Sequence, residues 1–138
     1  MKIEIIEKRI GEILDVLGLD LNDINLSKTP KRFAKMYVEE IFKGLNDSEF
    51  PIISGLMDNL ANKRFVIHKS LNIFSVCEHH LLPFYGFIHL AYIPKDKLIK
   101  VQDLQNIINF FSRRPQVQER ITKQVVDCFS KILNLEDI

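Results

Sequence analysis

Residues 64–93 read RFVIHKSLNIFSVCEHHLLPFYGFIHLAYI, and this stretch decides the fold class. Its two ends, 64–76 and 86–93, are rich in β-branched and aromatic residues, which predicts two strands. The segment between them contains CEHHLLPFY, so a cluster of cysteine and histidine is expected where one strand hands over to the next. The apolar residues of the first strand are expected to share one face: Phe65, Ile67, Leu71 and Ile73.

Helical patterns precede this pair of strands. Residues 3–17 place isoleucine and leucine at spacings of three and four, which predicts an amphipathic helix, and Gly18 marks its end. A second helix is predicted to begin at Thr29 as N-cap, with Pro30 at the first helical position. Gly44 stands where a C-terminal glycine of that helix is expected.

Helical patterns also follow the strands, over 101–112 and 116–133. Residues 45–63 carry asparagine, aspartate, serine, proline and glycine, which indicates a loop. The predicted order is therefore two helices, two strands and two helices. This order favours an α+β fold with helices on one face of a small antiparallel sheet.

Length and composition limit the classes of protein. The 138 residues predict a single domain over 1–138, with N-terminal helices over 1–45 and a core over 64–133. A net charge of +1 gives no reason to expect a nucleic-acid partner. No apolar run is long enough to span a membrane. The two cysteines make no disulfide framework, which favours the cytoplasm.

The motif Cys77-x-x-His80 places a thiolate and an imidazole three residues apart in an expected turn. Zinc accepts mixed sulfur and nitrogen ligands, and both side chains can reach one cation at this spacing. His79 could then act as a proton-transfer group. The alternative is that Cys77 is a buried thiol and the two histidines are ordinary turn residues.

Several other polar residues are expected to be structural. Cys128 falls on the apolar stripe of the last helix and is expected in the core. His68 and His89 lie within the predicted strands without a ligand pattern around them. Three arginines are expected to be solvated charges near helix ends: Arg113, Arg114 and Arg120.

Four segments occur in an order that is typical of one family. They are TPKRFAKMYVEEIFKGL at 29–45, CEHHLLPF at 77–84, AYIPKD at 91–96 and RRPQVQERITKQ at 113–124. With these segments the chain resembles GTP cyclohydrolase I, in its bacterial form, over nearly its whole length. The resemblance implies a hydrolase that converts GTP and water to 7,8-dihydroneopterin triphosphate and formate. That reaction is the first step of pterin and tetrahydrofolate biosynthesis.

The resemblance assigns roles to individual residues. Cys77 and His80 match the first two zinc ligands of the family, and His79 matches a catalytic histidine that shuttles protons while the guanine ring opens. In the family, zinc supplies the water that attacks C8 of GTP.

The resemblance also implies three substrate-binding residues. Gln118 and Glu119 match residues that read the guanine base, and Arg32 matches an arginine that helps to hold the triphosphate. A carboxylate suits guanine, whose adjacent N–H groups it can accept in pairs. Without the resemblance, Glu119 in the first turn of a helix would be explained by the helix dipole alone.

The chain departs from the family pattern in two respects. The family's third zinc ligand and second catalytic histidine lie beyond the segment that matches here, so the third ligand is expected to be absent from the chain. Asp103 stands at the position of a family lysine that contacts phosphate, and Asn106 at that of an arginine. A carboxylate beside a triphosphate would repel it.

The resemblance further implies a tunnelling fold, whose subunits join their sheets into a barrel with active sites between subunits. The family assembles as a decamer, so a homo-oligomer is expected here. The final two strands of the sheet are expected to be missing. The alternative is a truncated, catalytically inactive relative or an interaction module without cyclohydrolase activity.

Overall fold

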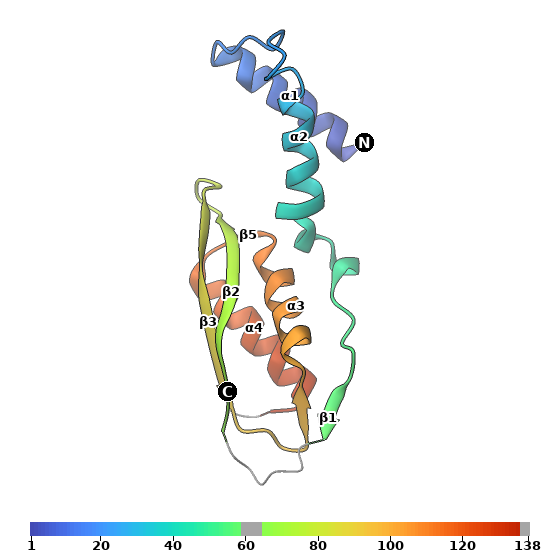
Figure 1. Ribbon diagram of the computed structural model, residues 1–138, viewed down its shortest axis with the longest axis vertical. Helices are drawn as coiled ribbons and strands as arrows, with labels where there is room; N and C mark the ends of the chain where they lie inside the picture. Colours follow the sequence, from blue (N-terminus) through green and yellow to red (C-terminus); the bar gives the residue numbers. More distant parts are fainter. Residues whose placement is uncertain (59–64, 136–138) are drawn as a thin grey trace. The chain divides into compact units, whose positions relative to one another are not determined.

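The computed structural model describes residues 1–58 and 65–135 (Figure 1). Within these ranges it contains four α-helices and two small sheets, so the predicted α+β class is confirmed. The chain divides into two compact units, Met1–Lys43 and Gly44–Ile138. The single domain over 1–138 stays a prediction.

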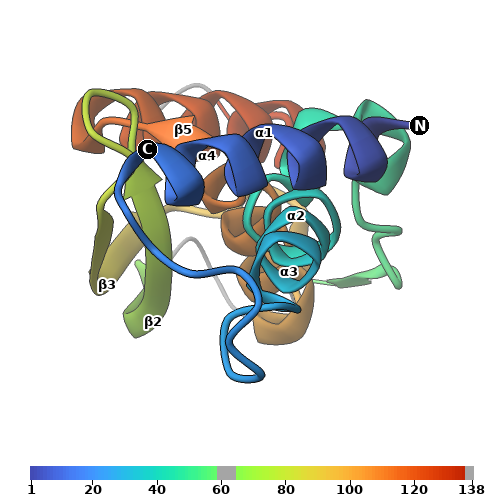
Figure 2. The ribbon, with the colours of Figure 1, turned by 90° about the horizontal axis from the view of Figure 1, so that it is seen from above.

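The first unit is helical. Helix α1 spans Lys2–Val16 and α2 spans Thr29–Met36, after which the chain continues as a π-helix, η1, over Tyr37–Ile41. Helix α1 crosses and packs against α2, which Figure 2 shows nearly end-on. Gly18, with φ of 81°, lies just past the end of α1 as predicted.

The prediction for the second helix is partly wrong. Its N-cap is Lys28 rather than Thr29, although Pro30 does lie in the first turn. Gly44 is not a left-handed cap either, but a buried residue in a 3₁₀ turn over Lys43–Leu45. A Cβ atom at Gly44 would lie 2.1 Å from the carbonyl oxygen of Phe110, so close backbone approach explains the glycine.

The second unit contains both sheets. Strands β2 (Val66–Cys77) and β3 (Pro83–Tyr92) form the predicted antiparallel hairpin, and β5 (Pro115–Gln116) pairs in parallel with β2, giving the order β3-β2-β5. Strands β1 (Leu56–Asp58) and β4 (Lys97–Ile99) form a separate antiparallel pair.

The predicted loop over 45–63 therefore contains more structure than expected. A 3₁₀ turn over Asp47–Glu49 and strand β1 lie within it, while 59–64 are outside the described residues. Strands β1, β4 and β5 have two or three residues each, too few for a periodic pattern to reveal them.

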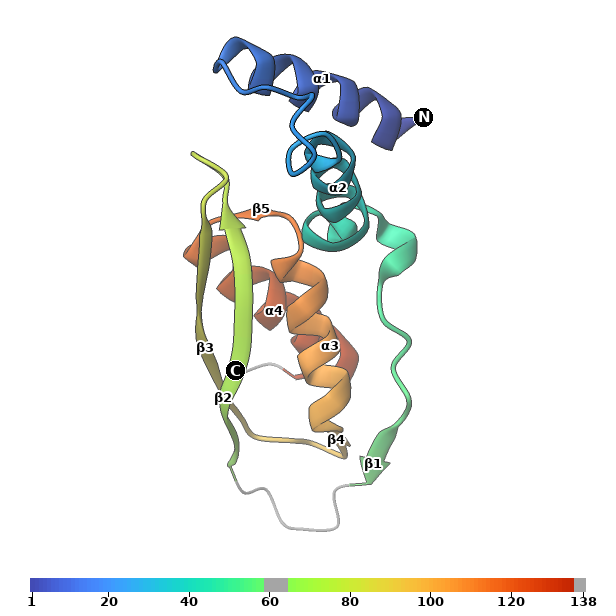
Figure 3. The same cartoon turned by 45° about the horizontal axis from the view of Figure 1, so that its top comes forward.

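Two helices cover one face of the hairpin, α3 (Val101–Ser112) and α4 (Gln118–Leu133) (Figure 3). Their buried faces meet the inner face of the strands in one hydrophobic core. Its fully buried large side chains come from both helices, from β3 and from β4: Tyr92, Ile99, Leu104, Ile107, Ile108, Ile121, Val125 and Phe129.

The predicted inner face of β2 is wrong for the residues before a β-bulge. The register with β3 shifts between His68 and Leu71, and an extra residue reverses which side chains point inward. Leu71 is 6% exposed, as predicted, but Phe65 is 71% and Ile67 is 57% exposed. Before the bulge it is Val66 that packs against the core.

No helix within 1–58 and 65–135 is long and apolar enough to cross a membrane.

Candidate active site

The Cys77–His80 segment forms the turn between β2 and β3, as predicted. The Cys77 backbone N–H donates to the Leu82 carbonyl at 2.8 Å, and the Leu81 N–H donates to the Cys77 carbonyl at 2.9 Å. Leu81 takes a left-handed conformation with φ of 55°. Two hydrogen bonds thus close the turn, which presents Cys77, His79 and His80 at one end of the hairpin.

The turn carries donors of the type that zinc prefers. The Cys77 Sγ atom lies 3.4 Å from Nδ1 of His79, and the ring centroids of His79 and His80 are 6.4 Å apart. Thiolate sulfur and imidazole nitrogen fit zinc. Across 1–58 and 65–135, however, no three histidine, cysteine, aspartate or glutamate residues gather as a metal site. The turn therefore fits zinc as part of a ligand set.

The first turn of α4 is bound to this hairpin turn. The Glu78 N–H donates to the carbonyl of Gln116, the last residue of β5, at 3.0 Å. The Glu78 carboxylate accepts two hydrogen bonds from Arg120, at 2.5 and 3.2 Å. These hydrogen bonds hold the pKa of Glu78 below its ordinary value and raise the pKa of Arg120. Arg120 is thus ion-paired, not merely a solvated charge.

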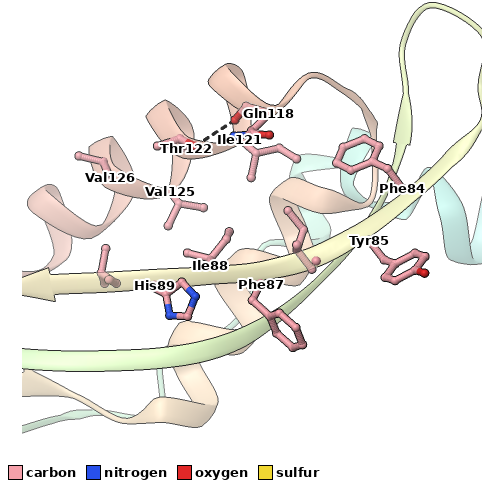
Figure 4. Close-up of a pocket in the computed structure, with 13 residues that line it drawn as sticks. Phe84, Tyr85, Phe87, Ile88, His89, Gln118, Ile121, Thr122, Val125 and Val126 are labelled. Atoms are coloured by element: carbon pink, nitrogen blue, oxygen red, sulfur yellow. Dashed lines mark hydrogen bonds between the residues drawn. The ribbon is translucent and has the colours of Figure 1, made fainter.

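Gln118 and Glu119 are exposed in the first turn of α4. Gln118 lines a pocket of about 300 Å³ between β3 and α4. Figure 4 shows Ile121 and Val125 of α4 facing β3, while Tyr85 and Phe87 point away from the helix. The Thr122 hydroxyl donates to the backbone carbonyl of Gln118 at 3.0 Å. The side-chain amide of Gln118 takes no part in this hydrogen bond.

The structure places the predicted site residues in two groups. The hairpin turn and the start of α4 lie in one unit and are joined by the Glu78–Arg120 pair. Arg32 lies exposed on α2 in the other unit and is not placed with them.

Asp103 has a partner within the fold. Its side chain is 3% exposed and accepts hydrogen bonds from the Ser54 N–H at 3.0 Å and the Ser54 hydroxyl at 2.8 Å. Asn106 accepts a hydrogen bond from Gln102 at 3.1 Å. The Asp103 carboxylate thus ties the segment before β1 to α3.

The remaining histidines and the second cysteine have structural contacts. The half-buried His68 ring stacks on Tyr92, with centroids 5.9 Å apart, and Nδ1 of His89 accepts from the Ser70 N–H at 3.2 Å. Cys128 packs against the core as predicted, and burial raises the pKa of its thiol.

The prediction of a solvated Arg114 is wrong. This half-buried guanidinium donates to the Gly44 carbonyl and lies over the Phe110 ring, 4.7 Å from its centroid. Burial lowers its pKa. Arg113, in contrast, is exposed as expected.

Sequence reasoning missed Glu78, Arg120 and Gln116 as partners. Glu78 contacts both Arg120 and Gln116 across a separation of about 40 residues, and no local pattern connects segments so far apart. The short strand β5, which brings them together, left no periodic signal.

Comparisons with a family profile and with individual proteins point to the same family. The chain matches the profile of a family described as GTP cyclohydrolase I over residues 6–138. It is 42% identical over 137 residues to GTP cyclohydrolase 1 of Flavobacterium johnsoniae and 43% identical over 137 residues to that of Vibrio cholerae. Each alignment covers 99% of this chain, but the chain spans only 61% and 63% of those relatives' lengths.

Proposed function

Because the chain belongs to the GTP cyclohydrolase I family, we propose that it carries the zinc turn and the base-reading helix of a GTP-hydrolysing site. The overall reaction converts GTP and water to 7,8-dihydroneopterin triphosphate and formate, the first step of pterin and tetrahydrofolate biosynthesis. The observation that carries the proposal is the joining of the Cys77–His80 turn to the first turn of α4 through Glu78 and Arg120.

Cys77 and His80 would hold the zinc ion, together with a donor from outside the described residues. When bound, zinc would supply Lewis acidity and an activated water near neutral pH. His79, whose Nδ1 lies 3.4 Å from the Cys77 sulfur, would move protons beside the metal.

Gln118 and Glu119 would orient the guanine. Both are exposed on the first turn of α4, where the helix dipole favours the negative charge of the Glu119 carboxylate. The Glu119 carboxylate would accept from adjacent guanine N–H donors, and the Gln118 amide would bind the neighbouring edge. Arg32 would contribute a positive charge toward the triphosphate.

The proposed assembly is a cytoplasmic homo-oligomer with the tunnelling fold of the family. Among the described residues, β3 pairs only with β2 and leaves its other edge without a strand. An unpaired edge of this kind favours pairing with a further strand. The final strands of the family's sheet would occupy that position.

The test is formate release from GTP by the zinc-loaded chain. The Glu119→Gln variant is expected to lose about 100-fold in rate, because it removes a charge-assisted acceptor for the base. Asp127→Asn on the exposed far part of α4 is the matched control and should keep the parental rate. Absence of formate from the parent, under conditions in which it is folded and loaded, would overturn the proposed reaction.

A further inference from the structure

The Glu78–Arg120 pair connects two elements that the proposed function requires to act on one substrate. Glu78 lies inside the Cys77–His80 turn, and Arg120 directly follows Gln118 and Glu119 on α4. We propose that this ion pair is a positioning device, which sets the distance between the zinc turn and the base-reading helix. The inference rests on the proposed function. It adds a role for Glu78 and Arg120, to which that function assigns no contact with zinc or with the guanine base.

The geometry of the pair suits positioning. Two parallel contacts, Nη1 to Oε2 at 2.5 Å and Nη2 to Oε1 at 3.2 Å, make a fork that restricts the relative orientation of the two side chains. A single lysine contact would restrict only the distance. The position of α4 therefore restricts the position of Glu78 in the hairpin turn.

Backbone contacts next to the pair make the connection stiff. The Glu78 N–H donates to the Gln116 carbonyl, and Cys77 pairs with Gln116 across β2 and β5. Gln116 is fully buried, and its side-chain Nε2 donates to the Phe111 carbonyl and to Gln124 Oε1. The turn is thus held by two contacts at Glu78: its backbone N–H bonds to β5, and its carboxylate bonds to Arg120.

Ordinary stabilisation by a surface ion pair would have a different signature. The side chains of Arg120 and Glu78 are 43% and 33% exposed, so the pair should contribute little to the free energy of unfolding. Residues that orient metal ligands, in contrast, commonly change metal affinity 10- to 100-fold when they are replaced. A positioning role therefore predicts weaker zinc binding without an equal loss of stability.

The experiment compares Arg120→Gln, Glu78→Gln and the exchanged pair Glu78→Arg/Arg120→Glu with the parent. Zinc affinity is measured by competition with a chromophoric chelator, and stability by thermal melting. Lys123→Gln, which breaks the exposed Lys123–Asp127 pair on the same helix, is the matched control. Both single variants should bind zinc about tenfold more weakly and melt within about 2 °C of the parent. The exchanged pair should regain most of the affinity.

Unchanged zinc affinity in both single variants would overturn the positioning role, as would a loss of affinity that only follows a large loss of melting temperature. Amide hydrogen exchange of Glu78 and Leu81 is measured in parallel, since these amides report on the turn without metal. If the parent binds no zinc, the proposed function fails while exchange still decides the inference. Faster exchange in Arg120→Gln but not in Lys123→Gln supports it, and equal exchange overturns it.

Discussion

At the scale of single residues, the backbone of Gly44 passes against the end of α3. Its N–H donates to the Arg113 carbonyl at 2.9 Å, and an added Cβ would lie 2.1 Å from the Phe110 carbonyl oxygen. Backbone atoms cannot yield as a flexible side chain would. Gly44→Ala should therefore reduce the free energy of unfolding by about 2 kcal/mol or more, measured by urea denaturation.

Gly86→Ala is the control for that measurement. Its added Cβ would make only an ordinary contact, 3.9 Å from the Ile73 side chain. The substitution should change stability by about 0.5 kcal/mol or less. Equal effects of the two substitutions would show that the close approach at Gly44 is relieved at little cost.

Arg114 and Arg113 are neighbours in sequence with opposite surroundings. Arg114 donates to the Gly44 carbonyl and covers the Phe110 ring, whereas Arg113 is exposed. Arg114→Ala should destabilise the protein by about 2 kcal/mol, because it removes a charged donor and its packing on an aromatic ring. Arg113→Ala should cost about 0.5 kcal/mol or less in the same assay, and the reverse order would refute the assignment.

His68 makes stability depend on pH. Its ring stacks on Tyr92, its Nε2 atom has no hydrogen-bond partner within the described residues, and burial lowers its pKa. The folded state therefore binds a proton less readily than the unfolded state, whose histidine pKa is about 6.5. The stability that neutral His68 contributes is fully present above about pH 6.5. It is lost as the pH falls through the pKa of His68 in the folded state.

The expected result is a fall in the free energy of unfolding from neutral pH towards acid, with a smaller slope in His68→Gln. Urea denaturation at several pH values between neutrality and about pH 5 provides the measurement. Parallel curves for the parent and the variant would contradict the assignment.

Single residues show where sequence reasoning reached its limit. The Cys77–His80 turn could be predicted because its donors are adjacent along the chain and the flanking strands are strongly patterned. The hydrogen-bond partners of Asp103 and Arg114 could not, since they lie about 50 and 70 residues away along the chain. Contacts at such separations depend on the tertiary fold, which leaves no local periodicity.

At the scale of elements, the long helices and the hairpin were predictable, and the short strands were not. Helices α1, α3 and α4 repeat apolar residues over three or more turns. Strand β5 has two residues and is defined only by its pairing with β2, which lies about 40 residues earlier in the chain. The bulge in β2 also escaped prediction, since an added residue exchanges the two faces without a change in composition.

The edge of strand β3 that is open within the described residues should favour association between copies of the chain. It contains no lysine, arginine, aspartate or glutamate, and its edge away from β2 carries no strand among the described residues. Phe87→Lys, at a side chain that is 64% exposed, should reduce light scattering as the protein concentration rises. Ile52→Lys, at a side chain 91% exposed outside this sheet, is the control and should reduce it less. Equal effects would assign the association to net charge alone.

At the scale of the whole molecule, membership in the GTP cyclohydrolase I family is supported along almost the full chain. The chain spans 61–63% of the length of the relatives named above. It holds the hairpin turn and the first turn of α4 in one compact unit, and Arg32 in the other. We therefore propose that the Cys77–His80 turn is a functional part of a zinc site.

Zinc binding by the two cysteine variants tests that claim most directly. Cys77 lies in the turn, whereas Cys128 packs against the core, so the chain provides its own matched control. Competition with a chelator should show zinc bound to the parent and to Cys128→Ala, and lost from Cys77→Ala. Equal zinc affinity in Cys77→Ala and the parent, or no zinc bound to the folded parent, would contradict the claim.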